Sequence, residues 1–418
     1  MATWFLIIIY LAFISLGLPD SLLGSAWPIM RSDIGASFSF AGVISMIVAG
    51  GTIVSSLVSG RLIQRLGTGK ITLISCCMTA GALLGFSMAP SLVWFAVLAL
   101  PLGLGAGSVD AALNSYIAEN YKAHHMNWLH CFWGVGATTG PIIMSYYIAE
   151  HASWRSGYTA VSMIQFALVL VLFFTLPLWK RIAASRESKN SENVGEHDGQ
   201  EAGLSRQESS AVQQGSVGQR SNAAENVLHI KGVKNSLIAF LFYCGVEATV
   251  GLWGASYLVG VKNITAENAA GWISLYYGGI TLGRLITGFI TLKVPNRLLI
   301  RYGQLVAAVG GIVFILPLPV PFSLVSLILI GLGLAPIYPG LLHETPSRFG
   351  KENSAKLMGY QMAVAYTGTT FLPPLFGVIA AHTSLDIFPY LVIAYLIFMM
   401  LSTEKVNHIL RRKAAIRD

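Results

Sequence analysis

The sequence predicts an all-α integral membrane protein with twelve transmembrane helices in two parallel-repeated six-helix halves. Three observations support this fold class: the composition, a series of long apolar stretches, and an internal repeat. Hydrophobic residues make up 54% of the 418 residues and charged residues 11%, whereas a soluble globular protein carries roughly 25% charged residues. So few charges cannot cover a soluble protein of this size, and we expect lipid to cover most of the surface.

Apolar stretches of about 20 residues, the length that crosses a hydrocarbon core of ~30 Å, occur six times in each half of the chain. The first six lie near 5–28, 38–60, 71–90, 92–118, 127–149 and 157–180. The second six lie near 235–259, 269–292, 299–317, 321–343, 357–381 and 384–403. Because the stretches are continuous rather than alternating, they favour helices over a barrel.

The loops between these stretches predict the orientation. One set of loops and the C-terminal tail hold most of the Lys and Arg residues, whereas the opposite set holds only Arg31, Arg155 and Lys262. By the positive-inside rule, both termini are expected in the cytoplasm, and we expect a cell (plasma) membrane protein. The first stretch has no positively charged leader and no small-residue cleavage site, so we expect a retained helix. The formal net charge of +8 then reports orientation, and we expect no nucleic-acid partner.

Four segments follow from these stretches. We expect an N-terminal six-helix bundle at 1–181, a disordered cytoplasmic linker at 182–232, a C-terminal six-helix bundle at 233–404 and a basic cytoplasmic tail at 405–418. The linker prediction rests on a run rich in Ser, Glu, Gln, Asn and Gly without Phe, Trp or Tyr, which cannot bury a core.

The two halves repeat at one fixed offset of 228 residues. Gly17 corresponds to Gly245, and the pair 50–51 corresponds to 278–279. The run 103–105, Gly-Leu-Gly, corresponds to the identical run 331–333. One offset without a shift over several spans indicates a parallel duplication, the plan of transporters whose substrate site lies at the midplane between two rocking halves.

The loop after the second span resembles a signature of the major facilitator superfamily. Residues 60–70 read Gly-Arg-Leu-Ile-Gln-Arg-Leu-Gly-Thr-Gly-Lys, with Gln64 at the position that is acidic in the family. The resemblance implies the major facilitator fold and a role for this loop in latching the cytoplasmic gate. The loop residues implied are Gly60, Arg65, Gly67 and Lys70.

A narrower set of patches resembles the fucose/proton symporter-like sugar family. These patches are Asp20 in the first span, the run 107–114 in the fourth, the run 127–132 opening the fifth, and Gly283-Arg284 in the eighth. In that family a first-span aspartate and a fourth-span glutamate handle substrate and proton. The resemblance therefore implies these roles for Asp20 and Asp110.

The membrane depth of four ionisable residues points to the same region independently. Asp20, Asp110, Glu247 and Arg284 all lie within predicted spans, where an ionisable group costs ~2.5–3.5 kcal/mol on insertion scales and usually faces a cavity or a partner. Loss of solvation favours the neutral form of a carboxylic acid, which suits a proton carrier. We therefore expect proton coupling at Asp20, Asp110 or Glu247; the alternative is that an acid pairs structurally with Arg284.

Amide, carboxylate and aromatic groups near these positions are expected to bind substrate. Amides and carboxylates bond to hydroxyl groups, and aromatic faces cover C–H patches of a sugar. The predicted substrate residues are Asn114, Asn127, His130, Trp133, Trp253, Arg284, Tyr338 and Gln361. For each aromatic residue, packing or an interfacial position is the competing explanation.

Other kinds of site are not indicated. The run 67–72 imitates a phosphate loop, but Gln64 stands where that motif needs Gly and Ile71 follows the lysine. The four cysteines show no metal-ligand spacing. We expect no enzyme activity, no cofactor and no metal, and we expect a monomer.

Two transport functions remain open at this point. The first is alternating-access, proton-coupled symport of a sugar or sugar-like polyol. The second is proton-coupled export of a drug or small metabolite, because residues 136–141, Gly-Ala-Thr-Thr-Gly-Pro, resemble the core of an exporter motif. A receptor that does not transport is a third class, although the linker holds no folded sensor domain.

Overall fold

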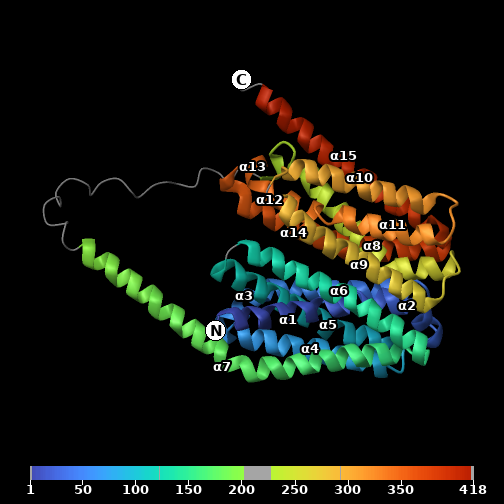
Figure 1. The fold of residues 1–418 in the computed structure, drawn as a ribbon, viewed down its shortest axis with the longest axis horizontal. Coiled ribbons are helices and arrows are strands. Elements are labelled where there is room, and N and C mark those ends of the chain that lie inside the picture. The colour runs from blue at the N-terminus through green and yellow to red at the C-terminus, as the bar shows by residue number, and fades with distance from the viewer. Residues whose placement is uncertain (1, 122, 202–226, 292, 416–418) are drawn as a thin grey trace.

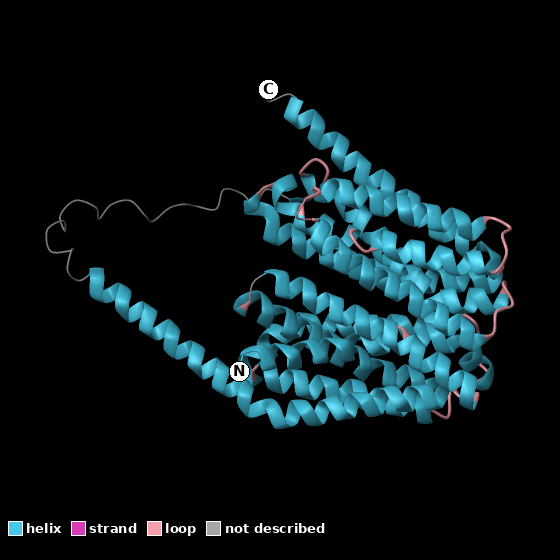
Figure 2. Cartoon of the chain, in the orientation of Figure 1, coloured by secondary structure: helices cyan, strands magenta, loops and turns pink. Residues whose placement is uncertain are grey.

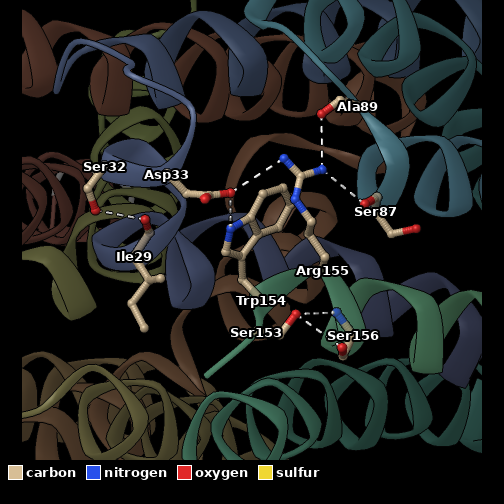
Figure 3. Close-up of polar contacts among 9 residues, drawn as sticks. All are labelled: Ile29, Ser32, Asp33, Ser87, Ala89, Ser153, Trp154, Arg155 and Ser156. Atoms are coloured by element: carbon tan, nitrogen blue, oxygen red, sulfur yellow. Dashed lines mark hydrogen bonds and ion pairs between the residues drawn. The ribbon is translucent and has the colours of Figure 1, made fainter. Parts of the chain in front are cut away.

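The computed structural model describes residues 2–121, 123–201, 227–291 and 293–415, and within these ranges the chain is helical and contains no strand (Figure 2). The first half contains seven helices: α1 (Ala2–Asp20), α2 (Leu22–Asp33), α3 (Phe40–Leu66), α4 (Thr68–Met88), α5 (Leu92–Asn120), α6 (Ala123–His151) and α7 (Trp154–Glu201). The second contains α8 (Val233–Gly260), α9 (Ala266–Ile290), α10 (Asn296–Ile315), α11 (Pro321–Leu334), α12 (Ile337–His343), α13 (Thr345–Phe349), α14 (Lys351–His382) and α15 (Phe388–Ala415). Short 3₁₀ turns, η1 (Val227–His229) and η2 (Leu385–Ile387), precede α8 and α15.

Ten segments in the described ranges are long and apolar enough to cross a membrane. Two of these spans are interrupted helices: α1 and α2 form Phe5–Asp33, and α11 and α12 form Pro321–His343. The predicted fifth and eighth spans are the long helices α6 and α9, which are less apolar. These two helices pack against each other between the halves, as where Gly134 meets Thr281, so protein rather than lipid covers part of their surface.

The break in the first span has a specific cause. Pro19 has no backbone N–H and cannot bond to the carbonyl of Ser15, four residues earlier. The Gln165 side chain takes over that carbonyl, with Nε2 donating to Ser15 O at 2.7 Å. The helix therefore ends at Asp20, in the middle of the first span, without leaving a buried carbonyl unpaired.

The three-dimensional contacts reproduce the repeat predicted from the sequence. A methyl group placed on Gly51 of α3 would lie 3.1 Å from both Leu100 O and Leu104 N of α5. A methyl group on Gly279 of α9 would lie 2.9 Å from Ile328 O and 3.2 Å from Leu332 N of α11. All three positions shift by 228, so the parallel duplication is confirmed.

The two halves lie side by side, with α1–α7 forming one and α8–α15 the other (Figure 1). Both termini lie at the same end of the bundle. The described contacts between the halves lie at mid-span or toward the opposite end, which we call the distal end. There the rings of Phe38 and Trp253 stack with centroids 4.4 Å apart, and Ser145 Oγ donates to Glu267 O at 2.7 Å.

Two helices continue beyond the expected six-helix bundles. α7 continues past the bundle to Glu201, so the beginning of the expected linker at 182–232 is helical, while 202–226 lies outside the described residues (Figure 1). α15 likewise continues through 405–415 of the expected tail. Extending an existing helix needs no new nucleus, so polar residues after a span continue the helix more readily than they would start one.

Candidate functional site

The four ionisable residues at membrane depth lie in two groups. Asp20, Glu247 and Arg284 gather with Trp133 in what we call the charge cluster, built from α1, α6, α8 and α9. Asp110 on α5 lies in a second group with Asn114 and with Tyr366 of α14. Each group therefore joins the N-terminal half to the C-terminal half.

Trp133 connects the two sides of the charge cluster. Its indole Nε1 donates to Asp20 Oδ2 at 2.8 Å. On the other side, the Arg284 guanidinium carbon lies 5.3 Å from the centroid of the same ring, a cation–π geometry. Asp20 and Trp133 belong to the first half and Arg284 to the second, so the cluster spans the interface between them.

Arg284 is paired only loosely with the acid of its own half. Its Nη2 lies 3.7 Å from Glu247 Oε1 and 3.4 Å from the Tyr243 hydroxyl, which accepts a hydrogen bond. The side chains of Arg284 and Glu247 keep 14% and 18% of their surface exposed. An ion pair at this depth is held in place by its mutual attraction, while part of the guanidinium remains available to another partner.

Tyrosines fix the C-terminal wall of the charge cluster. The Tyr276 hydroxyl donates to Glu247 O at 3.2 Å, which ties α9 to α8. Tyr277 lies edge-on to Trp133, with ring centroids 6.4 Å apart. The wall is thus formed by rigid rings that present hydroxyl groups and apolar faces.

The second group is built on one turn of α5. Asn114 Nδ2 donates to Asp110 Oδ1 at 2.9 Å, as the i,i+4 spacing allows. From the opposite half, the Tyr366 hydroxyl interacts with Asp110 and with Ser56 of α3. This arrangement offers a carboxylate, an amide and two hydroxyl groups, which is chemistry suited to a hydroxylated ligand.

Both groups contain solvent-accessible side chains although they lie at mid-span. Asp20 is exposed, and Trp133, Asp110, Asn114 and Tyr366 are half-buried. Trp133, Asp110 and Tyr366 contact residues of the opposite half, so both groups lie at the interface between the halves.

Two further predicted residues lie beside these groups. Tyr338 packs against Tyr243 with ring centroids 5.5 Å apart, and its hydroxyl lies 2.9 Å from Met362 Sδ. His130 is half-buried on α6, edge-on to Phe13 of α1 at 5.7 Å. The side chain of the predicted residue Asn127 lies outside the described part of the chain.

Two predicted substrate residues are placed elsewhere. Trp253 is fully buried toward the distal end, where it stacks on Phe38 and its Nε1 donates to Pro373 O at 2.8 Å. Gln361 is fully buried inside the C-terminal half, where its amide accepts from Thr345 at 3.0 Å and donates to Ser236 at 3.2 Å. The structure therefore gives both side chains packing partners away from the two groups, because each satisfies its polar atoms within the protein.

The predicted gating loop is the one-residue connection between α3 and α4. Gly67 has a φ of +82°, a conformation that side chains with a Cβ rarely adopt. Gly60, Arg65 and Lys70 are exposed around it, at the end of the bundle that holds the termini. The turn explains why glycine stands at position 67, and the gating role remains a prediction.

Tyr366 and Ser56 were not among the residues predicted from the sequence. A tyrosine or serine in an apolar span is usually a packing residue, so neither is conspicuous. The internal repeat offers a signal, because Tyr366 lies 228 residues after Thr138 and is its counterpart in the second half. Thr138 lies on α6 at the interface between the halves, which we call a seam, and its hydroxyl oxygen is 3.5 Å from that of Thr281. In the described residues, no group of three His, Cys, Asp or Glu side chains is arranged to hold a metal ion.

Residues 9–373 match the family model described as Major Facilitator Superfamily. The chain is 23% identical to the glucose/mannose transporter GlcP of Bacillus subtilis, over 79% of this chain and 77% of that protein. It is 22% identical to a cis,cis-muconate transport protein of Acinetobacter baylyi, over 75% of this chain and 71% of that protein. It is 27% identical to bypass of stop codon protein 6 of Saccharomyces cerevisiae over 67% of this chain, and the matched region spans 55% of the yeast protein.

Solved structures share the fold at low identity. A D-xylose-proton symporter superposes with a TM-score of 0.69 at 15% identity, covering 94% of this chain and 96% of the other. The nucleoside transporter NupG gives 0.69 at 12% identity, covering 96% and 98%. These likenesses show that the helices have the same arrangement.

Proposed function

Because the chain belongs to the Major Facilitator Superfamily, a family of multi-pass membrane transporters, we propose that it is a proton-coupled symporter of a sugar or sugar-like polyol. The observation that carries the proposal is the bridge formed by Trp133. One ring is hydrogen bonded to an accessible carboxylate of the first half and stacked under the guanidinium of the second. A change of charge on Asp20 therefore acts directly on the contact between the two halves.

We assign the proton to Asp20. Its carboxyl group is exposed, and among the described side chains it is held by the neutral indole N–H of Trp133 rather than by a cation. Glu247, by contrast, faces Arg284, with its Oε1 3.7 Å from the guanidinium Nη2. Glu247 then serves to hold Arg284 in place.

We assign substrate hydroxyl groups to the Asp110 group. Asp110, Asn114 and Tyr366 provide acceptors and donors that converge from both halves, and the half-buried face of Trp133 offers a surface for C–H groups. A glucose/mannose transporter among the relatives and a D-xylose-proton symporter of the same fold support this substrate class.

Alternating access follows from where the halves meet. The described contacts lie at mid-span and toward the distal end, which corresponds to a state open toward the termini. We propose that the termini are cytoplasmic, that the protein lies in the plasma membrane, and that it works as a monomer. The state described here is then the inward-facing one.

Uptake into proteoliposomes tests the proposal. Purified full-length protein is reconstituted, an inward proton gradient is imposed, and uptake is measured with labelled hexoses, pentoses and polyols. We expect accumulation of at least one compound that collapses when a protonophore is added. Accumulation without proton dependence, or none of any sugar or polyol, contradicts the proposal.

A second substrate class is favoured by one observation. The Arg284 guanidinium is incompletely paired at 3.7 Å from Glu247, and guanidinium groups bind carboxylates well. A relative named as a cis,cis-muconate transport protein supports an organic acid. The uptake panel therefore includes dicarboxylates, and it is run in the export direction with cationic drugs to test the alternative of proton-coupled export.

A further inference from the structure

A cluster of arginines lies at the terminus-bearing end of the C-terminal half, away from the mid-span groups. α10, α13 and α15 come together there. The cluster, which we call the arginine cluster, consists of Arg297, Arg301, Arg348 and Arg411.

Two of these four cations have a carboxylate partner. Arg301 donates to Glu404 through Nε at 2.9 Å and through Nη2 at 2.5 Å, a bidentate pair. Arg348 Nε donates to Glu344 Oε2 at 2.9 Å, one turn away. These pairs neutralise Arg301 and Arg348.

Arg297 and Arg411 are left without a carboxylate of their own among the described side chains. Arg297 is under the influence of Arg411, Arg301 and Arg348, against the single nearby acid Glu404. Like charges held close together repel each other, and an anion between them relieves that repulsion. The described part of the cluster therefore carries an excess of positive charge.

Two guanidinium nitrogens of the cluster also lack a hydrogen-bond partner among the described residues. Nη2 of Arg297 and Nη2 of Arg348 are buried and unpaired, and the Arg348 side chain is only 6% exposed. Buried hydrogen-bond donors normally have an acceptor. Two unsatisfied guanidinium nitrogens in one cluster therefore indicate that an acceptor from outside the described residues binds there.

The first turn of α10 adds a further attraction for an anion. α10 begins at Asn296 after Pro295, with no side-chain cap and no acidic residue in its first turn. The N-terminus of a helix of this length carries partial positive charge and free N–H groups, and both favour an oxyanion.

We propose that the arginine cluster and the first turn of α10 bind the phosphate group of an anionic membrane lipid. A lipid fits better than a soluble anion because the surface of α10 that continues into the bilayer is apolar. Leu298, Tyr302 and Leu305 are exposed along it, 37%, 57% and 42% respectively, and they provide a track for an acyl chain. The headgroup then lies at the membrane boundary, where the predicted span Asn296–Ile315 begins.

The proposal is tested by thermal unfolding of the purified full-length protein. Phosphatidylglycerol, phosphatidylcholine or inorganic phosphate is titrated into detergent-solubilised protein, and the shift in unfolding temperature is recorded. We expect a saturable shift with phosphatidylglycerol that phosphatidylcholine does not give. The variant Arg297→Gln should need about fivefold more phosphatidylglycerol for the same shift, because one cation near an anionic lipid surface is worth about 1 kcal/mol.

Lys405→Ala is the matched control, because Lys405 is an exposed cation on α15 and lies outside the arginine cluster. If Lys405→Ala weakens the lipid effect as much as Arg297→Gln, general attraction explains the binding and the site is refuted. If inorganic phosphate gives the full shift and displaces the lipid, the ligand is a soluble anion and the lipid assignment is wrong. Should Arg297→Gln unfold in phosphatidylcholine, Arg411→Gln, at an exposed position, makes the same measurement.

Discussion

The two seams between the halves are related by the repeat but differ in chemistry. The α6–α9 seam holds Trp133 and Arg284, and the α3–α14 seam holds Ser56 and Tyr366. Positions 284 and 56 correspond at the 228-residue offset, so an arginine in one seam stands where a serine stands in the other. Duplication thus supplied matching helices, and substitution along them made one seam charged and the other hydroxyl-rich.

This difference suggests that the charged seam responds to the proton and the hydroxyl-rich seam binds the sugar. A charged seam responds strongly to a proton, because a change of one charge alters every nearby electrostatic interaction in a poorly solvated place. A hydroxyl-rich seam exchanges hydrogen bonds with a sugar at little cost, since such bonds resemble those made with water. Four predictions test whether the seams divide the work in this way.

The largest effect is expected from breaking the ion pair of the charged seam. Arg284→Leu leaves Glu247 without its cation, and we expect a loss of about 3 kcal/mol of stability, near the lower end for a broken buried pair because both side chains keep some exposure. Transport should also be abolished. Thermal unfolding and proteoliposome uptake measure the two effects.

The double variant Arg284→Leu/Glu247→Leu separates the two effects. Two apolar side chains remove the unpaired charge, so stability should return while transport stays absent. Recovery of transport in the double variant would show that the pair is only structural.

The next effect distinguishes the two aspartates. Asp20→Asn should lower gradient-driven accumulation by about a hundredfold or more, the lower end of the range for a lost proton-transfer group, while sugar counterflow without a gradient continues. Asp110→Asn should raise the KM for sugar in both assays, because the Asp110 carboxylate interacts with Tyr366 of the hydroxyl-rich seam. Equal effects of the two variants in both assays would contradict the division of labour.

A smaller effect is expected from closing the seams with methyl groups. At Gly134 a methyl group would overlap the Thr281 side chain, whereas at Gly42 it would lie 2.8 Å from the Cα of Pro374. We expect each Gly→Ala change to cost about 1–3 kcal/mol through overpacking. Thr281→Ala should restore the stability lost in Gly134→Ala, because it removes the side chain that the new methyl group overlaps. Pro374→Ala should not restore the stability lost in Gly42→Ala, because the overlapping atom is a backbone Cα and remains. Equal recovery of the unfolding temperature in both pairs would show that the two seams tolerate added volume equally.

The smallest effects come from removing single hydrogen bonds. Trp133→Phe keeps a ring under Arg284 but loses the bond to Asp20, and Tyr366→Phe loses the bond to Asp110. Each bond is worth about 1 kcal/mol, or roughly fivefold in an equilibrium constant. Trp133→Phe should shift the pH dependence of uptake, and Tyr366→Phe should raise the KM for sugar; the reverse pattern would exchange the two assignments.

Much of the fold could be predicted from the sequence. Long apolar stretches identify spans because no other structure satisfies the backbone in lipid, and the fixed offset of the glycines predicts the duplication. The linker at 182–232 stays a prediction; the continuation of α7 to Glu201 could not be predicted, because composition does not show that a helix already formed continues into polar sequence.

The candidate site could be predicted only in part. The cost of an ionisable group at membrane depth identified Asp20, Asp110, Glu247 and Arg284, whatever their contacts. Amide and aromatic side chains carry no such cost once they are paired, so Gln361 and Trp253 looked the same in the sequence as Asn114 and Trp133. Tyr366 was missed for the same reason.

The sequence by itself determined that the chain spans a membrane as two repeated halves and that a few ionisable residues lie at mid-span, because both follow from transfer free energies of individual segments. Only the tertiary structure decided which half supplies each partner. Trp133 contacts Asp20 within the first half and Arg284 across the interface, and Asp110 meets Tyr366 from a helix more than two hundred residues away in the chain. Such pairings depend on the packing and rotation of helices, which glycine contacts set and which no local pattern records.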